Sequence, residues 1–349
     1  MPASPPPPPS STPAALPEPA AIGSLLVPLD GSPLAEAALP AACALAASLP
    51  ARLTLLHVLE RAAPATVHGH PHLGDPAAAE AYLADVASRL SAECRVPSAE
   101  PRGGSQEAVG GKPTHSALGT RHSALPVATH VHPNREGNVA KSIADHAAEL
   151  GTDMIVLCAH GAGGARGWLA GVMAQQVIRR SAPPVLLVRP LPDGGAPPFA
   201  PGAVLVALDG TATSAAALPP ALALARAMAV PLELAAVAPT SATIDPGRAP
   251  AAIVKPAATA AALDLEAEAL AAHLDRLASA ARAEGIDTRA RVLRGDPAPE
   301  IAAHAARLGS AVLVLATHGR GGLDAVWSGS VGSRVVARVA GPLLLVHPA

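Results

Sequence analysis

Residues 311–331 read AVLVLATHGRGGLDAVWSGSV. The first six residues form an unbroken apolar run, which is typical of a strand buried on both faces. Four glycines follow within residues 317–331, and the sequence then returns to a helical pattern. A strand that leads through a glycine-rich turn into a helix is a common anion site, because it exposes backbone N–H groups and the positive end of the helix.

The same pattern occurs a second time, 158 residues earlier. Without gaps, residues 143–190 and 301–348 are identical at 22 of 48 positions. Within them, CAHGAGGARGWLAGV at 158–172 aligns with ATHGRGGLDAVWSGS at 316–330. A repeat of this length indicates one domain that has been duplicated.

The beginnings of the two copies also match, but at a different offset. LLVPLDGS at 25–32 aligns with VLVALDGT at 204–211, an offset of 179. The difference between the offsets, 179 − 158 = 21, gives the first copy about 21 additional residues. We expect them in a long insertion at 60–126, of which the polar part at 97–126 has no hydrophobic period and is expected to be a loop.

Each copy alternates apolar strands with amphipathic helices. This order predicts a parallel sheet with helices on both faces, and right-handed crossovers then give a doubly wound α/β fold. In the second copy the expected strands are 203–208, 232–237, 287–293, 311–316 and 343–346, and the expected helices are 214–229, 263–284, 297–308 and 330–339. The prediction is therefore two tandem doubly wound five-stranded parallel-sheet domains, with the ligand crevice beyond the carboxyl ends of the strands.

Proline-rich segments mark the domain limits. The expected organisation is a disordered tail at 1–20, a first domain at 21–190, a linker at 191–202 and a second domain at 203–349. The last strand of each copy, at 185–188 and at 343–346, is apolar, and an apolar edge left bare favours aggregation. We therefore expect the two halves to pair as an internal pseudo-dimer, with a homodimer of the whole chain as a further option.

Composition excludes several classes of function. The net charge of −2 argues against a protein that binds the phosphate backbone of nucleic acid, and the four aromatic residues offer no platform for base stacking. No apolar run is long enough to cross a membrane. The three cysteines, Cys43, Cys94 and Cys158, show no paired spacing, so we expect free thiols in a reducing compartment and a cytoplasmic protein.

The glycine stretch resembles the ATP-binding branch of the universal stress protein family. That branch carries Gly-x-x-Gly, nine residues, and then Gly-Ser or Gly-Thr. The preferred alignment places this motif at Ala316 to Gly319 and at Gly329-Ser330, with Ala316 in place of the first glycine. A second register, Gly319 to Gly322 followed by Gly332-Ser333, also satisfies the pattern.

The resemblance implies a site for ATP, together with Mg²⁺, in the second copy. Its implied residues are Ala207, Asp209, Val237, Ala316, His318, Gly319, Arg320, Gly329, Ser330 and Val331. Asp209 is implied to contact the adenine or ribose, Val237 to border the adenine, and Gly329 and Ser330 to contact phosphates. Asp209 could instead be an ordinary turn residue, because Asp-Gly-Thr before a helix is common turn chemistry.

The first copy is expected to be degenerate as a nucleotide site. It has Val172 where the second copy has Ser330, and a valine offers no hydroxyl to a phosphate. It also has Cys158 where the family has glycine. We expect a tandem universal stress protein that binds one adenine nucleotide and acts as a stress-response regulatory module, with a nucleotide-free interaction scaffold as the alternative.

An efficient enzyme is not indicated, because no nucleophile–base pair or paired carboxylates stand out, and slow ATP hydrolysis is the most we expect. A hydrolase of the related adenine-nucleotide α-hydrolase type is a third reading. The segment His68-Gly-His70-Pro-His72 could hold zinc or nickel, but a solvated loop is preferred because no further ligand is suitably spaced. His146 and His304 occupy equivalent positions in the two copies and are expected to be structural.

Overall fold

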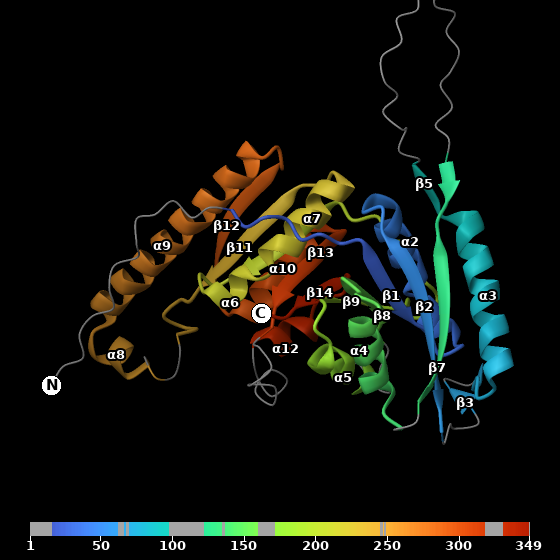
Figure 1. Cartoon of the computed structure of the whole chain (residues 1–349). Helices are drawn as coiled ribbons and strands as arrows, with labels where there is room; N and C mark the ends of the chain where they lie inside the picture. The colour runs from blue at the N-terminus through green and yellow to red at the C-terminus, as the bar shows by residue number, and fades with distance from the viewer. Residues whose placement is uncertain are drawn as a thin grey trace, which may run out of the picture.

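The ten main strands form one continuous sheet (Figure 1). In this computed structural model the described residues are 16–61, 66–67, 70–97, 122–134, 137–159, 172–244, 247, 249–317 and 331–348. The strands of the first half are β1 (Ser24–Pro28), β2 (Arg52–Glu60), β7 (Val127–Asn134), β8 (Met154–Cys158) and β9 (Val185–Val188). Those of the second half are β10 (Ala203–Leu208), β11 (Leu232–Ala238), β12 (Thr288–Arg294), β13 (Ala311–Ala316) and β14 (Leu343–Val346).

Both halves have the doubly wound topology that the sequence predicts. The sheet order is β12-β11-β10-β13-β14-β9-β8-β1-β2-β7, so each half has its first strand in the centre and its third strand at the outer edge. Within this ten-stranded sheet, all pairings inside a half are parallel. The two-domain α/β prediction is therefore confirmed.

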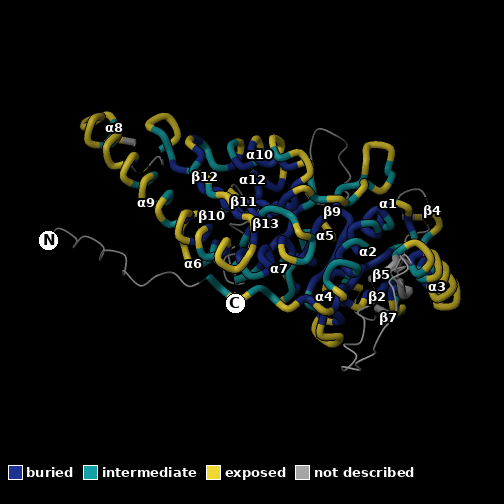
Figure 2. The backbone as a smooth tube through the Cα atoms, turned by 90° about the horizontal axis from the view of Figure 1, so that it is seen from above, coloured by how far each residue is buried: buried dark blue, intermediate teal, exposed yellow. Residues whose placement is uncertain are grey.

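Helices cover both faces of this sheet. The first half contains α1 (Pro33–Glu36), α2 (Leu39–Ser48), α3 (Pro76–Glu93), α4 (Val139–Glu149) and α5 (Val172–Arg180). The second contains α6 (Ala212–Ala215), α7 (Leu218–Met228), α8 (Ala249–Val254), α9 (Pro256–Ala283), α10 (Pro297–Leu308) and α12 (Val331–Val336). The core on one face draws on α2, α3, α7 and α9, and the core on the other face draws on α4, α5, α10 and α12. In Figure 2 buried strands run through the middle, and exposed positions gather on α3 at one end and on α8 and α9 at the other.

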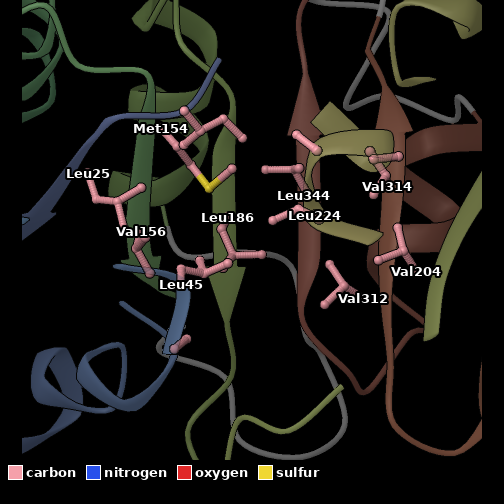
Figure 3. Close-up of a cluster of buried hydrophobic side chains, with 14 of the residues drawn as sticks. Leu25, Leu45, Met154, Val156, Leu186, Val204, Leu224, Val312, Val314 and Leu344 are labelled. Atoms are coloured by element: carbon pink, nitrogen blue, oxygen red, sulfur yellow. The ribbon is translucent and has the colours of Figure 1, made fainter. Parts of the chain in front are cut away.

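The two halves meet through their last strands. β9 and β14 pair antiparallel, with Leu186 opposite Leu344. Both side chains are fully buried and belong to a core that runs without interruption from one half into the other (Figure 3). The pairing removes the two apolar edges from solvent, and the expected internal pseudo-dimer is confirmed.

Prolines shape the helix after β10. One helix was expected over 214–229, but the structure divides it into α6 and α7. Pro219 and Pro220 lie in the first turn of α7, where their missing N–H groups would have no intrahelical acceptor in any case. The same residues would interrupt a helix that continued through them from residue 214.

The last residues of the expected N-terminal tail, 16–20, are among the described residues. The N–H of Ala20 donates to the carbonyl of Pro219 at 2.9 Å, and Leu16 packs against the core beside it. The segment at 16–20 thus lies against the second half, and residues 1–15 are outside the described residues.

The expected insertion at 60–126 contains a helix that belongs to the fold. α3 packs on β2 and β7 as α9 packs on β11 and β12, and its Leu83 and Val86 are fully buried. The segment also holds two short antiparallel strand pairs, β3 (Thr66–Val67) with β4 (His70–Pro71) and β5 (Arg95–Pro97) with β6 (His122–Ala124). The prediction of one long insertion is therefore wrong for 76–93, and most of the expected loop, at 98–121, lies outside the described residues.

The cysteines also differ from expectation. Cys43 of α2 and Cys94, which follows α3, form a disulfide with a Cα–Cα distance of 5.8 Å, whereas Cys158 is free and buried. The expectation of three free thiols is therefore wrong for this pair. No helix among the described residues is both long and apolar enough to cross a membrane.

Candidate functional site

A crevice opens at the carboxyl ends of the strands in the second half. It has a volume of about 230 Å³. β10 contributes its last residues and Asp209, β11 contributes Val237, and β13 contributes Ala316 followed by Thr317. α10 and α12 close one side, through Ile301 and Val335 among others. This is where a doubly wound sheet places its ligand, because the strand order reverses between β10 and β13.

The structure brings half of the expected site residues together. The crevice is lined by Ala207, Asp209, Val237, Ala316 and Val331. The other five lie in a segment, 318–330, outside the described residues: His318, Gly319, Arg320, Gly329 and Ser330. This segment leaves β13 and enters α12, and both of these elements contribute to the crevice wall.

The Gly-Ser pair of the second motif register also lies at the crevice. Gly332 and the buried Ser333, in the first turn of α12, are both lining residues. The pair of the preferred register, Gly329-Ser330, precedes α12 directly and is not among the described residues. Of the two registers, only the Gly-Ser pair of the second is thus seen at the crevice among the described residues.

Asp209 holds the turn between β10 and α6. Its Oδ1 accepts hydrogen bonds from the N–H of Thr211 at 2.9 Å and from the hydroxyl of Thr211 at 2.6 Å. Burial pushes the pKa of this carboxyl upward, but hydrogen bonds from Ser214 and Thr211 outweigh burial, so the net pKa lies below its usual range. Asp209 is thus an anion at neutral pH and has the turn role that the sequence suggested, while it also faces the crevice.

An ion pair fixes α12 against α10. The guanidinium of Arg334 binds the carboxylate of Asp296 with both terminal nitrogens, at 2.8 and 2.9 Å. Asp296 is also the N-cap of α10, since its side chain accepts from the N–H of Ala298. Arg334 lowers the pKa of Asp296 below its usual range. The pair orients the helix that carries Gly332 and Ser333, because planar bidentate contacts allow little rotation.

A model of the universal stress protein family matches residues 22–189 and 202–347. The chain belongs to this family. Among solved structures, it is similar to a universal stress protein from Archaeoglobus fulgidus DSM 4304, with 16% identity, a TM-score of 0.59 and coverage of 93% of this chain and 96% of that one. It is also similar to a functionally unknown protein from Pseudomonas aeruginosa PAO1, with 17% identity, a TM-score of 0.59 and coverage of 94% and 93%. At such identities the likeness shows the shared tandem fold. Among curated proteins, no match was found.

This universal stress protein has a second crevice of about 210 Å³ at the equivalent place in its first half. Asp30 occupies the position of Asp209, and its Oδ1 likewise accepts from the N–H and hydroxyl of Ser32, at 2.9 and 2.6 Å. Val58 occupies the position of Val237. The aspartate turn and the valine at the end of the second strand are therefore present at the crevices of both halves.

The side chains of the two crevices differ. At the offset of 179, His57 stands where the second half has Ala236. Its ring nitrogens lie 2.8 Å from the carbonyl oxygen of Leu29 and 3.0 Å from that of Leu73. Cys158 lines the first crevice where Ala316 lines the second, and burial, helped by the charge of Asp30, raises the pKa of its thiol to about 12. The wall of the first crevice thus carries a neutral thiol and a buried imidazole, where the second half has alanines.

The structure describes two of the three histidines of the metal alternative, His70 and His72. His70 is exposed, His72 has a buried side chain 3.8 Å from Glu60, and His68 lies outside the described residues. A different group, His130, His132 and His146, comes together on the first half of this universal stress protein. His130 and His132 were not among the expected metal ligands, although the alternation Thr-His-Val-His at 129–132 is a signal for two histidines on one face of a strand.

Proposed function

We propose that this universal stress protein binds ATP, or a related adenine nucleotide, in the crevice of its second half. The observation that carries the proposal is the juxtaposition of anionic Asp209 with apolar Ala207 and Val237 at the strand ends, beside the entry of the glycine-rich segment into α12. An adenine fits apolar walls, a ribose hydroxyl can donate to a carboxylate, and phosphates suit a backbone rich in exposed N–H groups. Mg²⁺ would accompany the phosphates.

The proposed role is that of a cytoplasmic stress-response module that changes its conformation or partners when the nucleotide is bound. No residue is proposed as a general base, and hydrolysis of ATP would be slow. The alternative is an interaction scaffold whose crevices stay free of nucleotide. One observation favours the alternative: the first half keeps a crevice at the same place although the side chains that line it differ from those of the second.

Mass spectrometry of the small molecules released from purified, denatured protein separates the two roles. An adenine nucleotide at close to one equivalent is the expected result. Protein that releases none, and that gives no heat on titration with ATP and Mg²⁺, would support the scaffold instead.

A matched pair of variants locates the site. Gly329→Asp adds bulk and a negative charge where the phosphates are proposed to bind, and at about 4 Å this charge repels another by about 4 kcal/mol, roughly a thousandfold in affinity. Gly171→Asp makes the same change at the equivalent position of the first half. We expect only Gly329→Asp to abolish binding, with circular dichroism as the check of folding. Equal affinity in both folded variants and in wild type would place the nucleotide elsewhere.

A further inference from the structure

Three histidines converge at the outer edge of the first half. His130 and His132 are two residues apart on β7, so their side chains emerge from the same face of the sheet. They pair with Leu56 and Val58 of β2, whose side chains belong to the core beneath α4 and α5. The last turn of α4 supplies His146 to this same face.

The three rings are close enough to share one ion. Their potential ligand atoms all lie within 4.8 Å of one another. The ring of His146 is 4.0 Å from that of His132 and 4.7 Å from that of His130, centre to centre. A tetrahedral zinc with nitrogen ligands at about 2.0–2.1 Å needs nitrogens about 3.4 Å apart, so small rotations of the rings are sufficient.

The polar edges of the rings point to a ligand. Nε2 of His130 and Nε2 of His146 are buried, and neither has a hydrogen-bond partner among the described residues. The His146 side chain is only 8% exposed. A buried polar atom without a partner costs free energy, so such atoms in a native protein call for an explanation such as a bound ion. Edge-on packing of the rings gives their carbon atoms favourable contacts, but it gives these two nitrogens no hydrogen-bond partner.

Glu149 prepares His146 for coordination. Its Oε2 lies 2.9 Å from Nδ1 of His146. A carboxylate on one ring nitrogen keeps the proton there and leaves the lone pair of Nε2 free, which is the arrangement around most histidine ligands. We propose that His130, His132 and His146 form a binding site for a divalent transition metal ion of the zinc class, with Glu149 as the residue that orients His146.

The second half provides an internal comparison. His304 corresponds to His146 at the offset of 158, but its Nδ1 lies 3.5 Å from Arg307, which stands where the first half has Glu149. On β7, His130 lies opposite Leu56 of β2, and at the equivalent position of the second half Arg291 lies opposite Ala235 of β11. An arginine therefore occupies the position of one proposed ligand. Burial lowers the pKa of His304, and the charges of Arg307 and Arg291 lower it further. Nε2 of His304 is also buried without a hydrogen-bond partner among the described residues, but it lies 3.9 Å from the buried carboxylate of Glu233, and the two arginines beside the ring would repel a metal cation.

Metal binding by the full, tag-free chain tests the proposal. After removal of metal with a chelator, the protein is equilibrated with ZnCl₂, dialysed and analysed for zinc by mass spectrometry, and its affinity is measured against a chromophoric chelator. We expect one zinc per chain. His130→Gln and His146→Gln should each weaken binding at least a hundredfold, and His304→Gln, the matched control, should leave it unchanged. Co²⁺ in place of Zn²⁺ should give a visible absorption spectrum that the first two variants lose.

A second variant keeps the test informative if a buried histidine cannot be replaced without unfolding. The carboxylate of Glu149 is exposed, so Glu149→Gln should fold normally and weaken zinc binding by about tenfold. His70→Gln tests the exposed loop and should have no effect. Absence of zinc from wild type, or equal loss in His146→Gln and His304→Gln, would overturn the proposal, as would loss in His70→Gln with Glu149→Gln unaffected.

Discussion

Arg189 and His347 occupy equivalent positions at the ends of the two last strands, and each reaches across the interface to an equivalent carbonyl. Arg189 donates from Nη2 to the carbonyl of Val336 at 2.6 Å, and Nε2 of His347 lies beside the carbonyl of Ile178. Val336 and Ile178 are themselves equivalent at the offset of 158. The duplication therefore keeps a two-fold set of contacts between each strand end and the opposite helix, in addition to the β9–β14 ladder. Burial lowers the pKa of Arg189 to about 10, which leaves its guanidinium charged at neutral pH.

Arg189→Met should destabilise the interface between the two halves. The substitution preserves much of the apolar stem but leaves the Val336 carbonyl without this donor, and a hydrogen bond from a charged group contributes about 1.5–3 kcal/mol. We expect a loss of about that size in the free energy of unfolding, measured by urea denaturation. Arg338→Met is the control, because the exposed Arg338, in the turn after α12, also donates to a carbonyl, that of Arg334, but within the same half. Equal stability of the two variants would mean that the contact across the interface contributes nothing.

Continuous apolar runs made most of the strands predictable from the sequence. The bounds of β10, β13 and β14 agree with those expected, and α10 begins at Pro297 as expected because Asp296 and Pro297 form a cap and first turn. The division between α6 and α7 was not predicted, because the spacing of apolar residues does not show that two adjacent prolines interrupt a helix.

The remaining differences depend on contacts between distant residues. Cys43 and Cys94 are 51 residues apart, and no local pattern brings them together. His146 joins His130 and His132 only because α4 folds back over β7, so their grouping is a result of topology and not of spacing. In the crevice of the second half, the fold predicted only the place beyond the strand ends, and the family resemblance supplied the residues Ala207, Asp209 and Val237, which do line it. Gly329 and Ser330 rest on the family resemblance and lie outside the described residues.

The Cys43–Cys94 disulfide should stabilise the first half. Closing a loop of this length restricts the unfolded chain, and such bonds contribute about 2–4 kcal/mol. We expect the double variant Cys43→Ser, Cys94→Ser to lose about that much free energy of unfolding under oxidising conditions, and to match wild type once both are measured in reductant. Thiol titration of oxidised, denatured wild type should then find one reactive thiol, that of Cys158, where the sequence has three cysteines. Three reactive thiols in air-oxidised protein would contradict the pairing.

The Asp296–Arg334 pair should make stability depend on acid pH. Arg334 lowers the folded-state pKa of Asp296 below its ordinary value of 3.8, so the unfolded chain takes up a proton first as the pH falls. The stabilisation is thus fully present above about pH 4 and is lost as the pH falls through the folded-state pKa. Asp296→Asn keeps a capping side chain and removes the charge. Its melting temperature should lie below that of wild type at pH 6, and the gap should shrink as the pH falls below about 4.

The background variant Arg334→Gln provides the control for this titration. Without the guanidinium, Asp296→Asn should change the melting temperature by a similar amount at pH 6 and at pH 3. A gap that stays pH-dependent in this background would assign the effect to other groups around α10.

Nucleotide binding should be asymmetric, with one site per chain in the second half. The crevices share the aspartate turn, but the first has Val172 in place of Ser330 and presents His57 and Cys158 at its wall. Loss of a hydroxyl that donates to a phosphate costs about 1.5–3 kcal/mol, or roughly tenfold to a hundredfold in affinity. Isothermal titration with ATP and Mg²⁺ should therefore return a stoichiometry near one.

Asp30→Ala and Asp209→Ala form a matched pair for this prediction. Each removes a carboxylate that accepts two equivalent hydrogen bonds within its turn, so the two variants lose a similar turn contact, although Asp209 also has a hydrogen bond from Ser214. If the second crevice alone binds nucleotide, Asp209→Ala weakens ATP binding and Asp30→Ala does not, although both melt at similar temperatures. A stoichiometry near two, with each variant removing half of the heat, would instead show that the first crevice binds ATP despite Val172.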